Sequence, residues 1–167
     1  MTNERSLNDY PHTLQESVRY GDTDRQGHVN NAVFSTFFEC SRTSILYDPA
    51  RKLITADREF VIVKFEVEYL AELAWPGIVE IGTRVVKLGR SSIVCEQAIF
   101  QHGVCAALST NVMVMIDAET RKSAPLPDHV ASVFTDLMVE WDPSSLRSVG
   151  MTWLWGFGER TPPQYNA

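Results

Sequence analysis

The sequence is poor in cysteine and has no long apolar segment, and both absences narrow its class. Its three cysteines, Cys40, Cys95 and Cys105, include no C-x-x-C pair, so the sequence predicts neither a zinc site nor a disulfide framework, and each is expected to be an inert core residue. No apolar run approaches the ~18 residues that a membrane-spanning helix requires, and the polar first ten residues do not resemble a signal peptide. We therefore expect a cytoplasmic protein with reduced thiols and no membrane partner.

Positive charge is also scarce. Fifteen Lys and Arg residues against 21 Asp and Glu residues give a net charge of −6. Nucleic-acid-binding domains normally present a basic face, so no nucleic-acid partner is predicted. A local patch of Arg and Lys could still hold an anionic ligand.

A chain of 167 residues is long enough to form one domain with its own hydrophobic core. We place this domain in residues 1–142. The remaining tail, 143–167, mixes Trp153, Trp155 and Phe157 with glycine and proline. It is expected to be a docked extension, an oligomer contact or a disordered segment.

Hydrophobic spacing predicts one helix after a first strand. Residues 13–20 alternate weakly and predict the strand. Over 30–46, apolar and small residues recur at steps of three and four, which places them on one helical face: Val33, Phe34, Phe37, Phe38, Ser41 and Ile45. Asn30 is a good N-cap for this helix, and Pro49 marks the exit of the chain from it.

Four further strands are predicted at 60–70, 78–88, 91–101 and 104–117. In the first, the period of two places five residues on the core face: Val61, Val63, Phe65, Val67 and Tyr69. His102-Gly103 predicts a two-residue hairpin loop. The last strand is partly apolar on both faces, so it should be central or covered by a second subunit. The fold class is therefore α+β, with one helix packed on the concave face of a curved antiparallel sheet.

The segment YGDTDRQGHVNNAVF, residues 20–34, concentrates polar residues just before the helix. Its D-T-D-R-Q-G portion matches the first half of a calcium-binding loop, but Val33 occupies the twelfth position, where a bidentate glutamate is needed. Zinc binding by Asp22, Asp24 and His28 would lack a further ligand elsewhere in the chain. No metal is predicted at this segment.

Two explanations of the segment remain. Asp, Asn and Gly are residues that turns and helix starts use in any case, so capping alone accounts for Gly27 and Asn30. Alternatively, an unpaired amide at the helix start can polarise a carbonyl oxygen, while a carboxylate upstream acts on the carbonyl carbon. Asp24 would then serve as general base or nucleophile in acyl transfer.

The pattern Y-G-D-T-D-x-x-G-H-V-N-N-A-x-F, followed by F-F-E-x-x-R, resembles the hotdog-fold acyl thioesterases of the 4-hydroxybenzoyl-CoA thioesterase type. The resemblance covers roughly residues 12–130. It implies a curved sheet around one long helix, edge-to-edge homodimers that often form dimers of dimers (homotetramers), and an active site at the dimer interface. The implied substrate is an acyl-CoA or acyl-carrier-protein thioester, and no cofactor is implied.

The resemblance also implies residue roles. Asp24 would carry the chemistry, the Asn31 amide would polarise the thioester carbonyl, and His28 would orient substrate or water. Asp22 would brace the loop, together with the turn at Gly27 and the cap at Asn30. Three residues of a predicted turn would contact CoA phosphates from the partner subunit: Lys87, Arg90 and Ser91. The alternative for this segment is an ordinary solvated hairpin turn.

Glu39 and Arg42 match the F-E-x-x-R element, and their spacing on a helix predicts a mutual ion pair. A different hotdog branch places its catalytic glutamate on this helix, which gives Glu39 a minor claim to catalysis. Two other functions stay open for the chain as a whole. One is a hotdog protein that binds an acyl ligand without hydrolysing it, and the other is an enoyl-CoA hydratase-type lyase.

Overall fold

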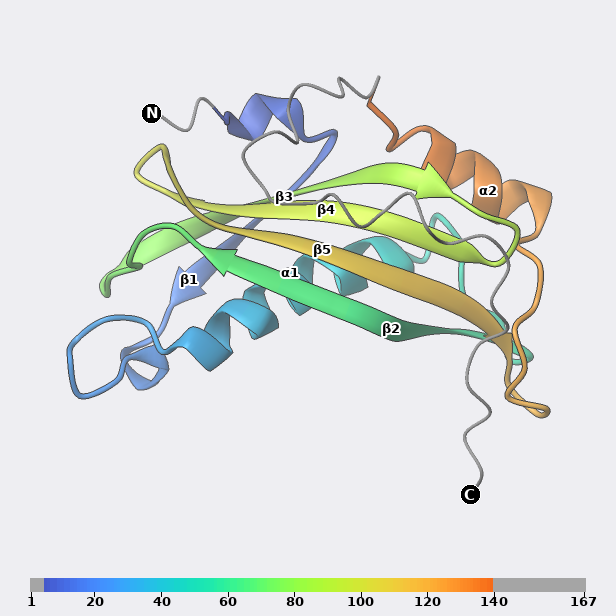
Figure 1. Ribbon diagram of the computed structural model, residues 1–167, viewed down its shortest axis with the longest axis horizontal. Helices are drawn as coiled ribbons and strands as arrows, with labels where there is room; N and C mark the ends of the chain where they lie inside the picture. The colour runs from blue at the N-terminus through green and yellow to red at the C-terminus, as the bar shows by residue number, and fades with distance from the viewer. Residues whose placement is uncertain (1–4, 140–167) are drawn as a thin grey trace.

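The computed structural model describes residues 5–139, and Figure 1 shows their arrangement. A single five-stranded antiparallel sheet, in the order β1-β3-β4-β5-β2, curves around helix α1. In chain order the elements are the 3-10 turn η1 (Leu7–Asp9), β1 (His12–Val18), the 3-10 turn η2 (Tyr20–Asp22), α1 (Asn31–Leu46), β2 (Arg58–Tyr69), β3 (Gly77–Leu88), β4 (Ser92–Gln101), β5 (Val104–Asp117) and α2 (Asp128–Thr135). The predicted tail, 143–167, and its boundary with the domain lie outside the described residues.

Helix α1 forms where the spacing of apolar residues predicted it. Its sheet-facing side is buried through Phe34, Phe37, Phe38, Ser41 and Ile45. The three phenylalanines pack on the concave face of the sheet in one cluster with residues such as Val79, Ile81 and Ile99. Within residues 5–139 no helix is long and apolar enough to cross a membrane.

Strand β2 departs from the predicted alternation. A bulge between Ile62 and Lys64 inserts Val63, which is 58% exposed. One inserted residue reverses which face each preceding side chain occupies. Phe60 therefore packs against the core in place of Val61, and its ring meets Phe134 of α2 edge to face. The prediction that Val61 and Val63 face the core was wrong, because the bulge depends on pairing with β5.

Strand β5 lies between β4 and β2, so the predicted central position is confirmed. The turn that leads into it has φ of 54° at His102 and 77° at Gly103, as expected for a two-residue hairpin loop. This arrangement leaves β1 and β2 as the two edge strands of the sheet.

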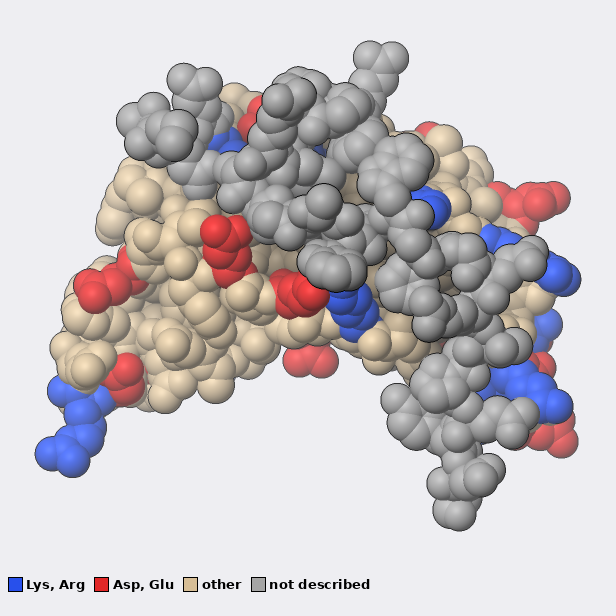
Figure 2. Space-filling model, viewed as in Figure 1, with Lys and Arg blue, Asp and Glu red and all other residues tan. Residues whose placement is uncertain are grey.

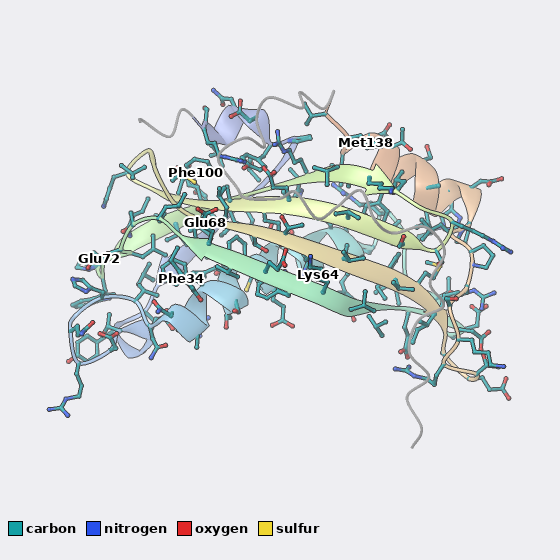
Figure 3. The ribbon with its side chains drawn as sticks, in the orientation of Figure 1. Phe34, Lys64, Glu68, Glu72, Phe100 and Met138 are labelled. Atoms are coloured by element: carbon teal, nitrogen blue, oxygen red, sulfur yellow. The ribbon has the colours of Figure 1, made fainter. Side chains whose placement is uncertain are left out.

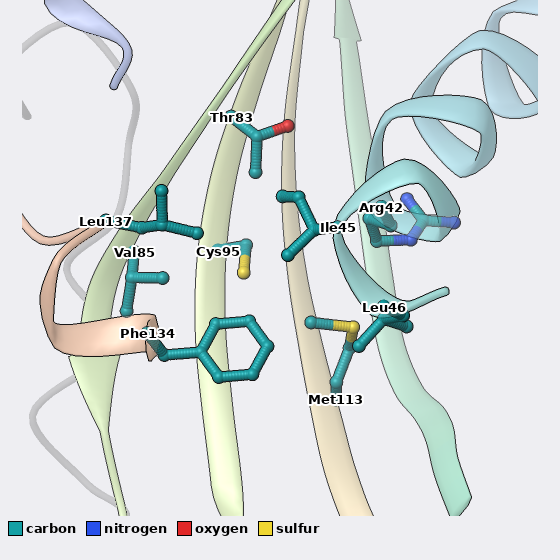
Figure 4. A pocket seen from close by; sticks show the side chains of 9 residues that line it. All are labelled: Arg42, Ile45, Leu46, Thr83, Val85, Cys95, Met113, Phe134 and Leu137. Atoms are coloured by element: carbon teal, nitrogen blue, oxygen red, sulfur yellow. The ribbon is translucent and has the colours of Figure 1, made fainter. Parts of the chain in front are cut away.

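The core beneath the C-terminal half of α1 is closed. Figure 4 shows Ile45 and Leu46 of the helix facing Met113 of β5, while Phe134 and Leu137 fill the space from the side of α2. All five side chains are at most 8% exposed. Any ligand site must therefore lie elsewhere, at the N-terminal end of α1 or on an open surface.

Candidate active site

The segment between β1 and α1 folds into a tight hairpin. Asp24 N–H donates to the His28 carbonyl at 2.9 Å, and Asn30 N–H donates to the Asp22 carbonyl at 2.8 Å. Gly27 N–H donates to the Asp24 carbonyl at 3.0 Å, and Gly27 has a φ of +86°. This is the pattern of a three-residue hairpin loop that ends in a left-handed glycine. The hairpin brings Asp24 back toward the start of the helix.

The start of α1 leaves one backbone amide available. The Asn30 side chain accepts from Ala32 N–H at 2.9 Å, so the predicted N-cap is present. The Asn30 carbonyl accepts from Val33 N–H at 2.8 Å. Within residues 5–139, no protein acceptor pairs with the Asn31 N–H, and Asn31 is exposed. The cap therefore satisfies the amides that follow in the first turn and leaves a donor at the positive end of the helix.

The Asp24 carboxylate is exposed, and only one of its oxygens is engaged within the described part of the chain. Oδ1 accepts from Gln26 N–H at 2.8 Å, which fixes the side chain relative to its own turn. Oδ2 has no protein donor among residues 5–139. One oxygen thus orients the group while the other is free to act on a proton or a carbonyl carbon.

Asp22 has different surroundings. Its Oδ2 accepts from Arg19 N–H at 2.7 Å, and its carbonyl accepts from Asn30 N–H, as described above. The first contact caps the 3-10 turn η2, and the second ties the two arms of the hairpin together. This geometry suits the bracing role that the resemblance implied for Asp22.

His28 contacts a residue that the sequence did not single out. Its Nε2 lies 3.0 Å from Oε2 of Glu72, with the side chains 41% and 72% exposed. Figure 3 shows Glu72 beside the hairpin, at the end of the molecule opposite Met138. The two meet because His28 forms a β-bridge with Ala74 and the Val29 N–H donates to the Leu73 carbonyl at 2.9 Å.

The backbone segment after β2 is held in place by a side chain of β4. The Gln101 side chain accepts from Ala74 N–H and donates to the Ala74 carbonyl, each at 2.9 Å, and Gln101 is 6% exposed. The Gln101 amide lies so close to Gly77 that a Cβ there would meet Nε2 at 2.6 Å. Gln101 therefore fixes the backbone at Ala74, which forms the β-bridge with His28 of the hairpin. These partners lie far apart along the chain, so no local pattern could have revealed them.

An exposed aromatic pair lies beside the same hairpin. The rings of Tyr20 and Trp75 meet edge to face with centroids 5.2 Å apart, and they are 73% and 46% exposed. Tyr20 belongs to η2, and Trp75 follows Ala74. The surface that flanks the hairpin is thus partly apolar.

The predicted ion pair between Glu39 and Arg42 is absent: within residues 5–139 no salt bridge joins them. Glu39 is exposed, whereas Arg42 is 6% exposed and faces the sheet. Its Nη1 donates to Gln97 Oε1 at 2.9 Å, and its guanidinium lies 5.2 Å from the centroid of the Phe65 ring. Burial lowers the pKa of Arg42. Arg42 turns inward because it shares the buried face of the helix, so the prediction was wrong.

Gln97 connects Arg42 to a buried polar network. Its Nε2 donates to Thr83 Oγ1 at 2.8 Å and to the Phe38 carbonyl at 3.1 Å, and its Oε1 also accepts from Asn111 at 3.0 Å. These bonds join the middle of α1 to three strands. The network fixes the helix on the sheet, and with it the position of the helix start.

The turn that contains Arg90 and Ser91, with Lys87 just before it near the end of β3, lies far from Asp24 within one chain. It joins β3 to β4 at one end of the sheet, and the hairpin lies at the other end (Figure 1). At about 3.3 Å per residue, a strand of this length separates the two by roughly 30 Å or more. Lys87 and Arg90 are exposed, and Ser91 is half-buried. A single chain does not bring these residues to the hairpin.

The cysteines are poor nucleophiles. Cys95 and Cys105 are buried, as predicted, and burial raises the pKa of their thiols to about 12 and about 11. Cys40 is half-buried beside an open groove, and burial raises the pKa of its thiol as well. The expectation that Cys40 belongs to the core was wrong. In the part of the chain that the structure describes, no group of three His, Cys, Asp or Glu side chains is placed to hold a metal ion.

Residues 18–134, well over half of the chain, match the model of the thioesterase-like superfamily. The chain belongs to this superfamily. Acyl-CoA thioester hydrolase YbgC of Escherichia coli is 30% identical over 121 residues, which cover 70% of this chain and 90% of that protein. This thioesterase-like chain therefore spans nearly the whole length of a curated relative.

Solved structures give the same result. A thioesterase of Thermus thermophilus, complexed with coenzyme A and zinc, is 34% identical with a TM-score of 0.66, and the match covers 77% of this chain and 95% of that one. A protein of Pseudomonas aeruginosa strain PAO1 is 26% identical with a TM-score of 0.76, over 82% and 98%. The predicted hotdog fold and the predicted reaction class, hydrolysis of an acyl thioester, are confirmed for this thioesterase-like chain.

Proposed function

We propose that the protein hydrolyses acyl-CoA thioesters, with Asp24 as the reacting carboxylate and the Asn31 N–H as the oxyanion donor. The observation that carries the proposal is the Asn31 amide, unpaired within residues 5–139, which follows directly on the hairpin that presents a free Asp24 oxygen. The relatives support the choice of substrate: one is named an acyl-CoA thioester hydrolase, and another was solved with coenzyme A.

The chemistry needs only these two groups and water. As general base, Asp24 removes a proton from water while the water oxygen attacks the thioester carbonyl carbon. The carbonyl oxygen becomes an oxyanion that accepts from the Asn31 N–H, where the helix dipole adds stabilisation. Collapse of this intermediate breaks the carbon–sulfur bond and releases the thiol and the free acid.

A nucleophilic route uses the same pair. The free Asp24 oxygen attacks the carbonyl carbon directly and expels CoA thiolate, which leaves a mixed anhydride. Water then hydrolyses the anhydride and regenerates the carboxylate. In both routes we expect His28, whose Nε2 lies 3.0 Å from Glu72 Oε2, to orient substrate or water.

A second copy of the chain would complete the site. Edge strand β2 exposes Ile62 (46%) and Val63 (58%), which suits pairing with the same strand of another copy. A two-fold axis at that edge reverses the ends of the partner. The partner's β3–β4 turn then lies at the same end as the hairpin, and its Lys87, Arg90 and Ser91 can meet the CoA phosphates. Dimers of this kind can pair again into tetramers.

The charges around the hairpin are mixed. Figure 2 shows acidic side chains near the end of the sheet that carries the hairpin, where Figure 3 labels Glu68 and Glu72, a basic group at the tip of that end, and both acidic and basic side chains at the opposite end. CoA carries several phosphates, so the Lys87 and Arg90 of a reversed partner would add cations to those that one chain offers.

The test is thiol release from a panel of acyl-CoAs. The panel contains straight acyl chains of increasing length, benzoyl-CoA and an acyl-carrier-protein thioester, so that it also reports the preferred acyl group and thiol. We expect release above the uncatalysed rate for at least one acyl-CoA. Tight acyl-CoA binding without thiol release would instead identify a ligand-binding protein. Loss of enoyl-CoA absorbance without release would identify a lyase.

A further inference from the structure

Tyr69 makes a hydrogen bond to the residue that carries the proposed oxyanion amide. It is the last residue of β2, and its hydroxyl donates to the Asn31 carbonyl oxygen at 3.1 Å. This carbonyl is the first one of α1. A carbonyl oxygen has two lone pairs, so it can accept from Tyr69 and also take part in the helix.

Tyr69 is 47% exposed, but both its backbone and its ring make contacts that fix its position. Its backbone pairs with Ala107 of β5. Its ring meets the Phe34 ring edge to face, with centroids 5.1 Å apart and an interplanar angle of 83°. Phe34 is 2% exposed and belongs to the first turn of α1, which Figure 3 shows beside the end of β2. The hydroxyl is therefore positioned by the sheet and the core.

We propose that Tyr69 is a positioning residue for thioester hydrolysis: by holding the Asn31 carbonyl it restrains the backbone of Asn31, so that the N–H of the same residue points at the developing oxyanion. The inference rests on the proposed function. Asn31 lies at the junction of a hairpin and a helix, where the cap contacts come from the neighbouring residue Asn30. Helix ends fray, so a tether to the sheet restricts the motion of this amide.

The expected size of the effect follows from geometry. An oxyanion donor works at about 2.7–3.1 Å from the oxyanion, and its contribution falls quickly when the donor is displaced. A misplacement of ~1 Å at a reacting centre can lower the rate about 100-fold. A looser Asn31 keeps its N–H, so the loss should be smaller, roughly 10-fold in kcat. We expect KM for the CoA substrate to change little, because the Tyr69 hydroxyl is engaged by the Asn31 carbonyl.

The experiment compares Tyr69→Phe with Tyr47→Phe. Tyr69→Phe removes the hydroxyl that binds the Asn31 carbonyl. Tyr47→Phe removes the same group from a tyrosine that lies at the C-cap of α1 and is 68% exposed. We expect Tyr69→Phe to lower kcat roughly 10-fold with KM within about twofold of wild type, and Tyr47→Phe to change neither. In the NMR spectrum, the Asn31 amide signal should shift only in Tyr69→Phe.

Asp24→Asn in the same assay separates the two proposals. If Asp24→Asn loses activity but Tyr69→Phe matches Tyr47→Phe, the positioning role of Tyr69 is rejected and the proposed function stands. A rise in KM with unchanged kcat would also reject it, because that result indicates a binding contact. Failure of Tyr69→Phe to fold, seen by circular dichroism, would make the hydroxyl a stability determinant and reject the inference. If wild type and Asp24→Asn release thiol equally, the proposed function itself fails.

Discussion

Asp24 and His28 close the hairpin that carries the candidate active site, through a hydrogen bond of 2.9 Å from the Asp24 N–H to the His28 carbonyl. One arm of this hairpin presents the Asp24 carboxylate. The other arm leads through Asn30 into the first residue of α1, Asn31, whose amide is unpaired within residues 5–139. The distance between the carboxylate and the amide is thus set by a short turn and a helix cap, both of which can be altered one residue at a time.

Gly27→Ala should weaken the hairpin through backbone strain alone. The φ of +86° disfavours any residue with a Cβ, although nothing lies within 4 Å of the position a Cβ would take. We expect a loss of about 1–2 kcal/mol in unfolding free energy, measured by urea denaturation, and slower thiol release. Gly21→Ala is the matched control, because it has equal space and no positive φ. Equal losses in both variants would contradict this explanation.

Asn30→Ala should remove the cap on Ala32. Its Oδ1 is the acceptor for the Ala32 N–H, and loss of such a cap costs about 1 kcal/mol. Asn30→Ser keeps an acceptor oxygen and should recover most of the stability. The measurement is the midpoint of thermal unfolding for the three proteins. A serine variant as unstable as the alanine variant would show that the cap is not the cause.

Local chemistry explains why the cap, the hairpin and the helix were predictable from the sequence. Gly27 and Asn30 act through their own backbone and that of their neighbours, so their residue types predict their conformation. The failed predictions for β2 and for Arg42 depend on partners far along the chain. The bulge at Val63 is set by pairing with β5, and Arg42 meets Gln97, 55 residues later. Tyr69 likewise reaches Asn31 across 38 residues.

Stability should fall in alkaline solution because of the buried thiols. Burial raises the pKa of the Cys95 thiol to about 12, whereas the pKa of a cysteine in the unfolded chain is about 8.5–9. The protonated thiol is favoured in the folded state, so this contribution is complete below about pH 8.5 and is lost as the pH rises toward about 12. The slope is about 1.4 kcal/mol per pH unit for this thiol. Urea denaturation at a series of pH values should give a shallower slope for Cys95→Ala, and an identical slope would contradict the assignment.

Arg90→Gln should weaken the binding of CoA substrates. If the partner's β3–β4 turn holds the phosphates, the variant should raise KM for acyl-CoA and leave kcat nearly unchanged. The same acyl group carried on pantetheine, which lacks the nucleotide phosphates, provides the control substrate. Its KM should not respond to the substitution. A parallel rise for both substrates would place Arg90 outside the phosphate site.

The most direct test of the account is the kcat/KM of Asp24→Asn on the acyl-CoA that wild type hydrolyses best. Asparagine has the shape of aspartate but can neither accept a proton as a base nor act as a carboxylate nucleophile. We expect a loss of roughly 1,000-fold or more with an unchanged circular dichroism spectrum. Asp136→Asn, at the exposed C-cap of α2, should keep full activity. Equal rates of thiol release by wild type and Asp24→Asn would contradict the assignment of Asp24 as the reacting group.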